Sequence, residues 1–172
     1  MPTSTPVTLE ALPPWARALL DEARVARLSY VDERDRPRVL PVTFAVEGGA
    51  VWSAIDEKPK RTRHPARLRH LSRRPEAALL VDVYDDDWSR LAWVQLMGTV
   101  EIVDASNARD ALRVLAAKYP QYAERTPPGP LLRLRVERAL QWRAADGAPP
   151  PASGSPPSAG SPRRDHSLQD PG

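Results

Sequence analysis

Cysteine is absent from this 172-residue chain, and histidine is scarce, with three residues. The missing cysteine excludes a disulfide scaffold, thiolate catalysis and a zinc site built on sulfur. No stretch approaches the roughly 18 to 20 apolar residues that cross a bilayer. The start, MPTSTPVTLEALPPW, lacks the basic and apolar regions of a secretory signal. We therefore expect a cytoplasmic protein that does not span a membrane.

Lysine is also rare, so most of the positive charge is carried by arginine. The net charge is only +3, yet eight Lys or Arg residues and no Asp or Glu lie between Lys58 and Arg74. The rest of the chain is therefore net negative, and the positive charge is concentrated in one segment. A net charge this small gives little long-range attraction for nucleic acid.

The spacing of apolar residues predicts a mainly β fold with a few peripheral helices. Most connections have hairpin length, which favours an antiparallel sheet or barrel over a doubly wound parallel sheet. Gly48 and Gly49 are typical of a tight hairpin turn. Helices are expected at 12–24, at 63–73 and from a cap at Asp104 or Ser106 to about 118; the six expected strands are 25–31, 38–46, 50–55, 77–84, 91–103 and 131–142.

The composition changes at about Asp146, where GAPPPASGSPPSAGSPRRDHSLQDPG begins with the next residue. This stretch has almost no large apolar side chains and cannot bury a core. We therefore expect one folded domain over residues 1–145, followed by a disordered tail over 146–172.

The basic segment begins at a predicted junction between a strand and a helix. A helix N-terminus has unpaired N–H groups and attracts anions, phosphate especially. Lys58, Lys60, Arg61 and Thr62 are therefore candidates for a phosphate site. Two alternatives stay open. The arginines farther along, from Arg67 to Arg74, are typical of a solvated helix face, and they are also compatible with a nucleic-acid surface, although no aromatic residues alternate with them.

Other constellations point less clearly to chemistry. The run Asp85 to Asp87 has no calcium-loop spacing and is typical of a polar turn. His64 and His70 are expected at the surface of the basic helix, away from any carboxylate motif. No serine-hydrolase motif is present. The tryptophans Trp52, Trp88 and Trp93 are expected in the core, or as a wall for a planar ligand.

The order of these segments resembles the pyridoxamine-5′-phosphate-oxidase-like split β-barrel flavoproteins. The resemblance covers about 25–142 and is carried by RLSYVDERDRPRVLPVTFAVEGGAVWSAIDEKPKR, the basic helix that ends in RRP, and AALLVDVYDDDW. More narrowly, VTFAV, VWSAIDEKPKRTR and LLVDVYDDDWSRLAWVQLMGTVEIV resemble the branch of probable deazaflavin (coenzyme F420)-dependent enzymes. The resemblance implies a homodimer of six-stranded antiparallel split barrels, with the cofactor in a cleft at the subunit interface.

The resemblance also implies which residues bind the cofactor. The strands on either side of the glycine hairpin are expected to line the ring system, and the basic residues after the second strand to hold the phosphate. A helix arginine and two tryptophans, from the same or the opposite subunit, are further candidates. The ring-lining residues are Leu40, Pro41, Val42, Thr43, Trp52, Ser53 and Ala54; the phosphate ligands are Lys58, Lys60, Arg61 and Thr62; the further candidates are Arg69, Trp88 and Trp93.

The implied function is an F420-dependent oxidoreductase that transfers hydride between the bound cofactor and a small organic substrate. Such chemistry needs neither a metal nor a cysteine. The alternatives are an FMN-dependent oxidoreductase, a non-enzymatic carrier or sensor of flavin, F420 or haem, and a basic module for RNA or DNA. No single residue is singled out as a proton donor.

Overall fold

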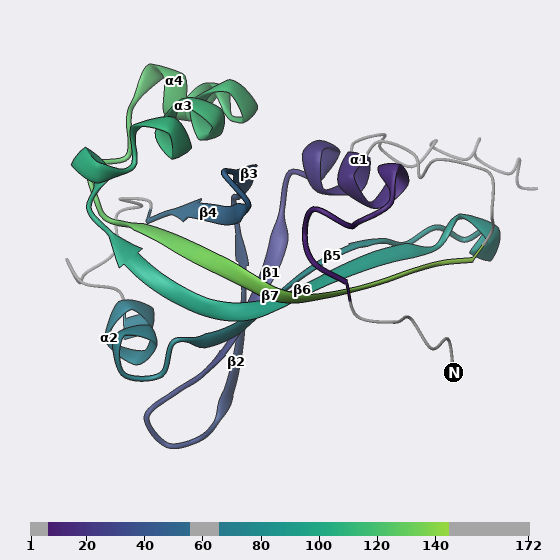
Figure 1. Cartoon of the computed structure of the whole chain (residues 1–172), viewed down its shortest axis with the longest axis horizontal. Coiled ribbons are helices and arrows are strands. Elements are labelled where there is room, and N and C mark those ends of the chain that lie inside the picture. Colours follow the sequence, from purple (N-terminus) through teal and green to yellow (C-terminus); the bar gives the residue numbers. More distant parts are fainter. Residues whose placement is uncertain (1–6, 56–65, 145–172) are drawn as a thin grey trace, which may run out of the picture.

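The computed structural model describes residues 7–55 and 66–144. Helix α1 (Pro14–Glu22) begins with a proline, which suits a first helical turn because its missing N–H needs no partner there. Seven antiparallel strands and three further α-helices follow (Figure 1). The strands are β1 (Ala26–Val31), β2 (Pro37–Val42), β3 (Ala45–Glu47), β4 (Ala50–Ala54), β5 (Glu76–Val83), β6 (Ala92–Val103) and β7 (Leu131–Arg143); the helices are α2 (Ala66–Arg73), α3 (Arg109–Lys118) and α4 (Pro120–Glu124).

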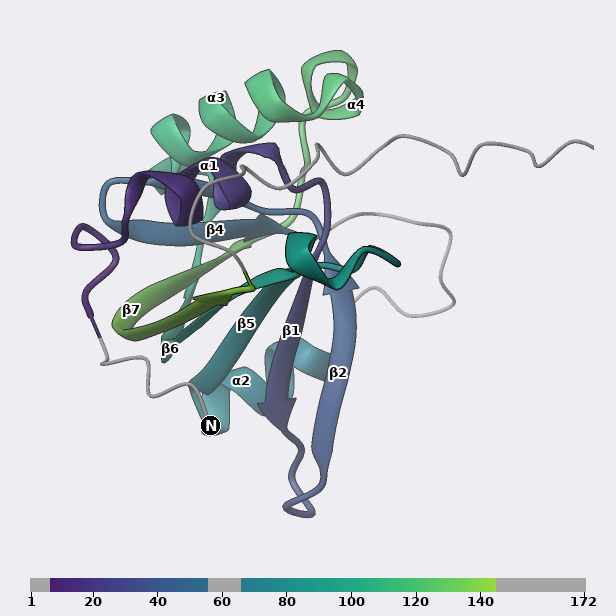
Figure 2. The same ribbon diagram turned by 90° about the vertical axis from the view of Figure 1, so that its right-hand side faces the viewer.

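The mainly β prediction is confirmed, but the expected count of six strands is wrong. The expected strand over 38–46 is interrupted at Thr43 and Phe44, and its two parts become β2 and β3. The strands form one sheet in the order β2-β1-β5-β6-β7-β4-β3, so β2 and β3 are its two edges. Because only two residues join these edges, the sheet must curl to bring the end of β2 to the start of β3; Figure 2 shows the curled sheet. No strand pairing joins β2 to β3, and the curled sheet stays open there.

The glycine hairpin is confirmed. Gly48 and Gly49 have φ angles of 57° and 70°, and the turn joins β3 to β4. Two consecutive positive φ angles suit the right-handed twist of a hairpin, and only glycine adopts both without steric cost.

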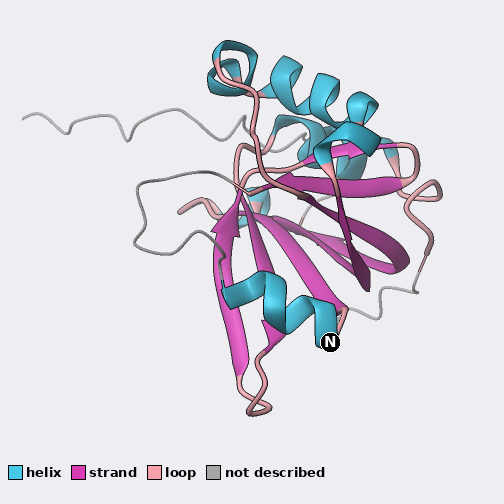
Figure 3. Ribbon diagram, turned by 90° about the vertical axis from the view of Figure 1, so that its left-hand side faces the viewer, coloured by secondary structure: helices cyan, strands magenta, loops and turns pink. Residues whose placement is uncertain are grey.

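One core fills the inside of the curled sheet. It joins the inward side chains of the strands, such as Leu28, Leu79 and Val94, to Leu19 of α1 and Leu71 of α2. A second, smaller core lies between α3 and the strands β3 and β4, around Leu115. Figure 3 shows the helices arranged around this β framework. No helix in the described part of the chain is long and apolar enough to cross a membrane.

The start of the third predicted helix is wrong. Asp104 and Ser106 make no capping hydrogen bond to it; a 3₁₀ turn (Ala105–Asn107) intervenes, and α3 is preceded by Ala108. The short helix α4 lies between the predicted helix that ends at about 118 and the predicted strand over 131–142, where no helix is expected from the sequence.

A tyrosine hydroxyl satisfies the backbone at the interruption between β2 and β3. Phe44 is fully buried, and its N–H donates to Tyr119 Oη at 2.9 Å. The same Oη lies 2.9 Å from the Phe44 carbonyl and 3.0 Å from the Arg24 carbonyl, and its one proton serves one of them. The hydroxyl thereby takes the place of a neighbouring strand.

Tyr119→Phe should therefore lower the free energy of unfolding by about 2 to 4 kcal/mol, because it leaves a buried N–H and a buried carbonyl unpaired. Urea unfolding followed by circular dichroism measures this. Tyr84→Phe is the matched control, since Tyr84 is 73% exposed. Equal stability of the two variants would show that the Tyr119 hydroxyl does not hold this corner.

Lys118, the residue before Tyr119, also contacts Phe44. Its ammonium donates to the Leu20 carbonyl at 2.8 Å and lies 4.0 Å from the centre of the Phe44 ring. Burial lowers the pKa of Lys118 to about 8, against a partly opposing effect of Asp21. Burial also raises the pKa of Tyr119. Two titrating groups of this corner thus have altered proton affinity in the folded state.

These pKa directions predict how stability varies with pH. Between pH 8 and about 10 the unfolded chain keeps the Lys118 proton while the folded chain has lost it, so stability should rise with pH. Above about pH 10 the unfolded chain loses the Tyr119 proton while the folded chain keeps it, so stability should fall. Urea midpoints at fixed ionic strength test both slopes. Lys118→Met should flatten the rise, and an unchanged rise in that variant would contradict the assignment.

Candidate functional site

The ends of β2 and β4 meet beside the interruption in the sheet. β2 ends at Val42, and Ala45, three residues later, pairs with Trp52 of β4. The backbones of Pro41 to Thr43 and of Ser53 and Ala54 therefore lie at the same corner. The structure thus brings together the two segments that were expected to line a ring system.

The side chains of these residues are divided among different faces. Val42 belongs to the inner core, and Ser53 has the same parity along β4 as the core residues Val51 and Ile55. Ala54 and Trp52 face the second core under α3, and the Thr43 hydroxyl lies 2.7 Å from Tyr122 Oη of α4. Pro41 is exposed. A flat ligand at this corner would therefore contact backbone as well as side chains.

Ser53 carries an unused hydrogen-bonding group at this corner. Its side chain is 5% exposed, and its Oγ has no hydrogen-bond partner. A buried hydroxyl without a partner costs roughly 1 to 3 kcal/mol, so an ordered water or a bound ligand that reached this group would be stabilised by it. The apolar corner and this hydroxyl fit a planar cofactor that carries polar atoms on its ring.

The predicted phosphate ligands Lys58, Lys60, Arg61 and Thr62 lie outside the described residues, as does His64. On one side of them the chain leaves β4 through the buried Ile55, and on the other side it enters α2 at Ala66.

Helix α2 is held to the β1–β2 loop by ion pairs. Arg69 and Arg73 both lie 3.1 Å from the carboxylate of Glu33, and Arg74 pairs with Asp35. The predicted solvated face therefore has carboxylate partners, although these arginines stay about half exposed. Arg69 faces Glu33 in this arrangement, and its predicted role toward a cofactor stays a prediction.

The surface position predicted for His70 is wrong. His70 is 7% exposed, and its ring stacks on Tyr30 with a centroid separation of 6.1 Å. Next to it, the buried Asp32 accepts hydrogen bonds from the backbone N–H groups of Arg34 and Arg36 and from the Arg36 guanidinium. These bonds hold the pKa of Asp32 far below its usual range, with the Arg36 side chain the largest cause. Asp32 thus fixes the turn to which α2 is held by its ion pairs.

Trp88 and Trp93 lie far from this corner in the same chain. Trp88 is 70% exposed on a 3₁₀ turn (Trp88–Arg90) between β5 and β6. Trp93 lies near the start of β6, opposite Trp142, whereas Ser53 pairs with Leu132, which pairs with Ile102 near the end of β6. At about 3.3 Å per residue, this length of strand spans up to about 30 Å.

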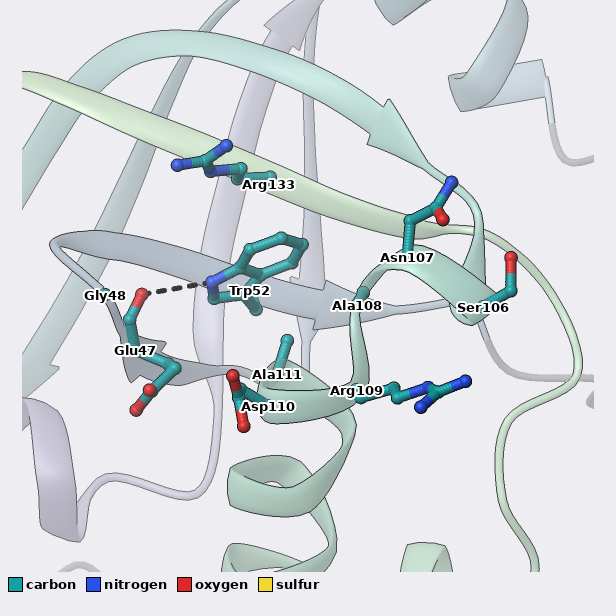
Figure 4. A pocket seen from close by; sticks show the side chains of 10 residues that line it. All are labelled: Glu47, Gly48, Trp52, Ser106, Asn107, Ala108, Arg109, Asp110, Ala111 and Arg133. Atoms are coloured by element: carbon teal, nitrogen blue, oxygen red, sulfur yellow. Dashed lines mark hydrogen bonds between the residues drawn. The ribbon is translucent and has the colours of Figure 1, made fainter.

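A pocket of about 330 Å³ lies on the outer side of β4 (Figure 4). Trp52 forms its wall and donates from Nε1 to the Glu47 carbonyl at 3.1 Å. The guanidinium of Arg133 lies 5.4 Å from the centre of the Trp52 ring, and the first turn of α3 closes the other side. Sequence reasoning missed Arg133, although its place between Leu132 and Leu134 of β7 indicates an outward side chain.

A wider groove of about 450 Å³ crosses the outer face of β1, β5, β6 and β7. Ala78 and Met97 lie side by side in its lining, next to Gly98. A side chain at Gly98 would collide with the Arg135 carbonyl at 1.9 Å, because the strands approach closely at the β-bulge there. No three His, Asp or Glu side chains of residues 7–55 and 66–144 group as a metal site.

The comparisons with known proteins agree with this architecture. A family model described as pyridoxamine 5′-phosphate oxidase matches residues 12–143. The chain therefore belongs to this family. No curated protein sequence matches the chain.

Solved structures show the same fold. The heme binding protein from Mycobacterium smegmatis has a TM-score of 0.62 and 18% identity, covering 80% of this chain and 57% of that chain. HutZ, the heme storage protein from Vibrio cholerae, has a TM-score of 0.60 and 16% identity, covering 80% of this chain and 97% of that chain. An FAD-binding protein from Mesorhizobium loti has a TM-score of 0.54 and 17% identity, covering 76% of this chain and 96% of that chain. Likeness at these identities establishes the fold.

Proposed function

We propose that this protein binds a phosphorylated flavin-type cofactor, F420 with FMN as the alternative, and transfers hydride between it and a small organic substrate. One observation carries the proposal: the ends of β2 and β4 meet at an apolar corner beside the unpartnered Ser53 hydroxyl. The chain leaves that corner directly into the segment that holds Lys58, Lys60 and Arg61. Membership of the pyridoxamine 5′-phosphate oxidase family and the fold shared with an FAD-binding protein support a flavin-type ligand. The preference for F420 rests on the resemblance of the sequence motifs.

Each group of residues has a distinct task in this proposal. The ends of β2 and β4, around Val42 and Ala54, lie along the flat ring with their backbones as well as their side chains, and the Ser53 hydroxyl supplies a hydrogen bond to a polar ring atom. Lys58, Lys60, Arg61 and Thr62 hold the phosphate through charge-assisted hydrogen bonds. The bound cofactor supplies the hydride chemistry. The chain's own part is to bind the cofactor, orient its ring and leave one face open to the substrate.

Haem is the less favoured ligand, although two structures of the same fold are named as haem proteins. Among the described residues, His70 is the one histidine. It is buried and stacked on Tyr30 rather than directed into a pocket wide enough for a porphyrin, since the cavity it lines measures about 130 Å³. A Soret band in the purified protein would nevertheless favour haem over the flavin-type cofactors.

We propose further that the protein acts as a homodimer with the cofactor at the interface. Trp93 and the corner at Ser53 are separated by up to about 30 Å along β6, so a contribution of Trp93 to the cofactor site would have to come from a second subunit. The outer face of the sheet suits such an interface because both cores lie elsewhere, inside the curl and under α3. Its half-buried apolar side chains include Leu80, Trp93, Met97, Leu140 and Trp142.

The cofactor proposal predicts binding of F420 or FMN at micromolar concentration. Titration followed by quenching of cofactor or tryptophan fluorescence measures it. The variant Lys58→Ala with Lys60→Ala should weaken binding by roughly 3 to 6 kcal/mol, because the cofactor phosphate loses two charge-assisted hydrogen bonds worth about 1.5 to 3 kcal/mol each. Arg113→Ala is the control, since Arg113 is an exposed cation on α3. If neither cofactor binds the wild type, the oxidoreductase proposal fails. If the wild type binds a cofactor and the double variant binds it equally well, the phosphate site lies elsewhere.

The dimer proposal predicts a mass of about twice 19.1 kDa in light scattering after size exclusion. Met97→Lys should give monomers, because it replaces a half-buried apolar side chain of the proposed interface with a second cation next to Arg138, its partner on β7. Val25→Lys is the control, since Val25 is exposed and precedes β1. A wild type that elutes as a monomer at all concentrations would exclude the proposed interface.

A further inference from the structure

Two tyrosines of the helical layer contact consecutive residues at the corner between β2 and β3. Tyr119 Oη bonds to the backbone of Phe44, and Tyr122 Oη lies 2.7 Å from Thr43 Oγ1. Their rings are 5.6 Å apart between centroids and inclined at 60°. The two contacts differ in kind, because Tyr119 satisfies the main chain whereas Tyr122 bonds to a side chain.

The backbone requires the first contact but not the second. Phe44 is fully buried, so its N–H and carbonyl need partners wherever the strand is interrupted. The Thr43 side chain is only half buried, and its hydroxyl can find a partner in water. A second tyrosine on this hydroxyl therefore does more than satisfy a buried group: it restrains Thr43 Oγ1 to one direction.

Tyr122 is itself held in a fixed place. Its N–H donates to the Tyr119 carbonyl at 2.9 Å, and α4 begins at Pro120, directly after Tyr119. Tyr119 is in turn anchored to Phe44 and lies at the end of α3. The position of the Tyr122 hydroxyl is thus tied to the same corner that it contacts.

We propose that Tyr122 is a positioning residue for the cofactor site and acts through the Thr43 hydroxyl. This inference rests on the proposed function, in which Thr43 lines the ring system. A hydroxyl has one proton and two acceptor positions, so when Tyr122 donates to Thr43, the Thr43 proton is free to bind a carbonyl oxygen or ring nitrogen of the cofactor. The helical layer then sets the direction of a polar contact at the end of β2.

The test compares cofactor binding in a double-mutant cycle of Tyr122→Phe and Thr43→Val. Tyr122→Phe should raise the Kd of the cofactor that binds the wild type about three- to tenfold, which corresponds to one neutral hydrogen bond. Thr43→Val should raise it by a similar factor. The double variant should bind no more weakly than Thr43→Val alone, because in this proposal Tyr122 acts on the cofactor through the Thr43 hydroxyl. Fluorescence titration at 15 °C, with folding checked by circular dichroism, gives all four constants.

The outcomes separate this inference from the proposed function. A wild type that binds neither F420 nor FMN overturns both. A wild type that binds, with an unchanged Kd in Tyr122→Phe, overturns the inference alone, whether or not the variant melts at a lower temperature. If the rise in Kd of the double variant equals the product of the rises in the two single variants, the inference is overturned as well, since Tyr122 would then act independently of Thr43.

Discussion

The curled sheet depends on a two-residue link between its two edge strands. Thr43 and Phe44 join β2 to β3, which stand at opposite ends of the strand order. No strand pairs with the backbone at this link, so its polar groups need other partners. Tyr119 supplies them for Phe44, and Tyr122 bonds to Thr43. The helical layer of α3 and α4 is therefore part of how the barrel holds its shape, in addition to covering one face.

The same corner joins structure to the proposed function. β4 ends there with a buried, unpartnered hydroxyl at Ser53, and β2 ends there with a hydroxyl held by a tyrosine. An apolar corner with a few directed polar groups is the usual composition of a cofactor site. On the other side of the sheet, α2 is fixed by Glu33 and Asp35 to the turn that Asp32 organises. Much of the positive charge of α2 is thus balanced within the chain.

The sequence predicted local elements well where the pattern was strong. The glycine hairpin, the β-rich runs and the first helix follow from spacing and from the residues that turns require. The division of 38–46 was not predictable, because Thr43 and Phe44 continue the alternation of the strand, and the break depends on a tyrosine 75 residues away. His70 was misplaced for a related reason: its burial depends on Tyr30, which lies on a different element.

The sequence by itself determined the fold class and the segment in which positive charge is concentrated, since both follow from periodicity and composition along the chain. It also indicated the two segments that meet at the corner, through their likeness to a known family. Only the tertiary structure decided which faces their side chains occupy, which arginines have carboxylate partners, and that Tyr122 contacts Thr43. These features depend on strand register and on contacts between residues far apart in the chain, which local patterns do not encode.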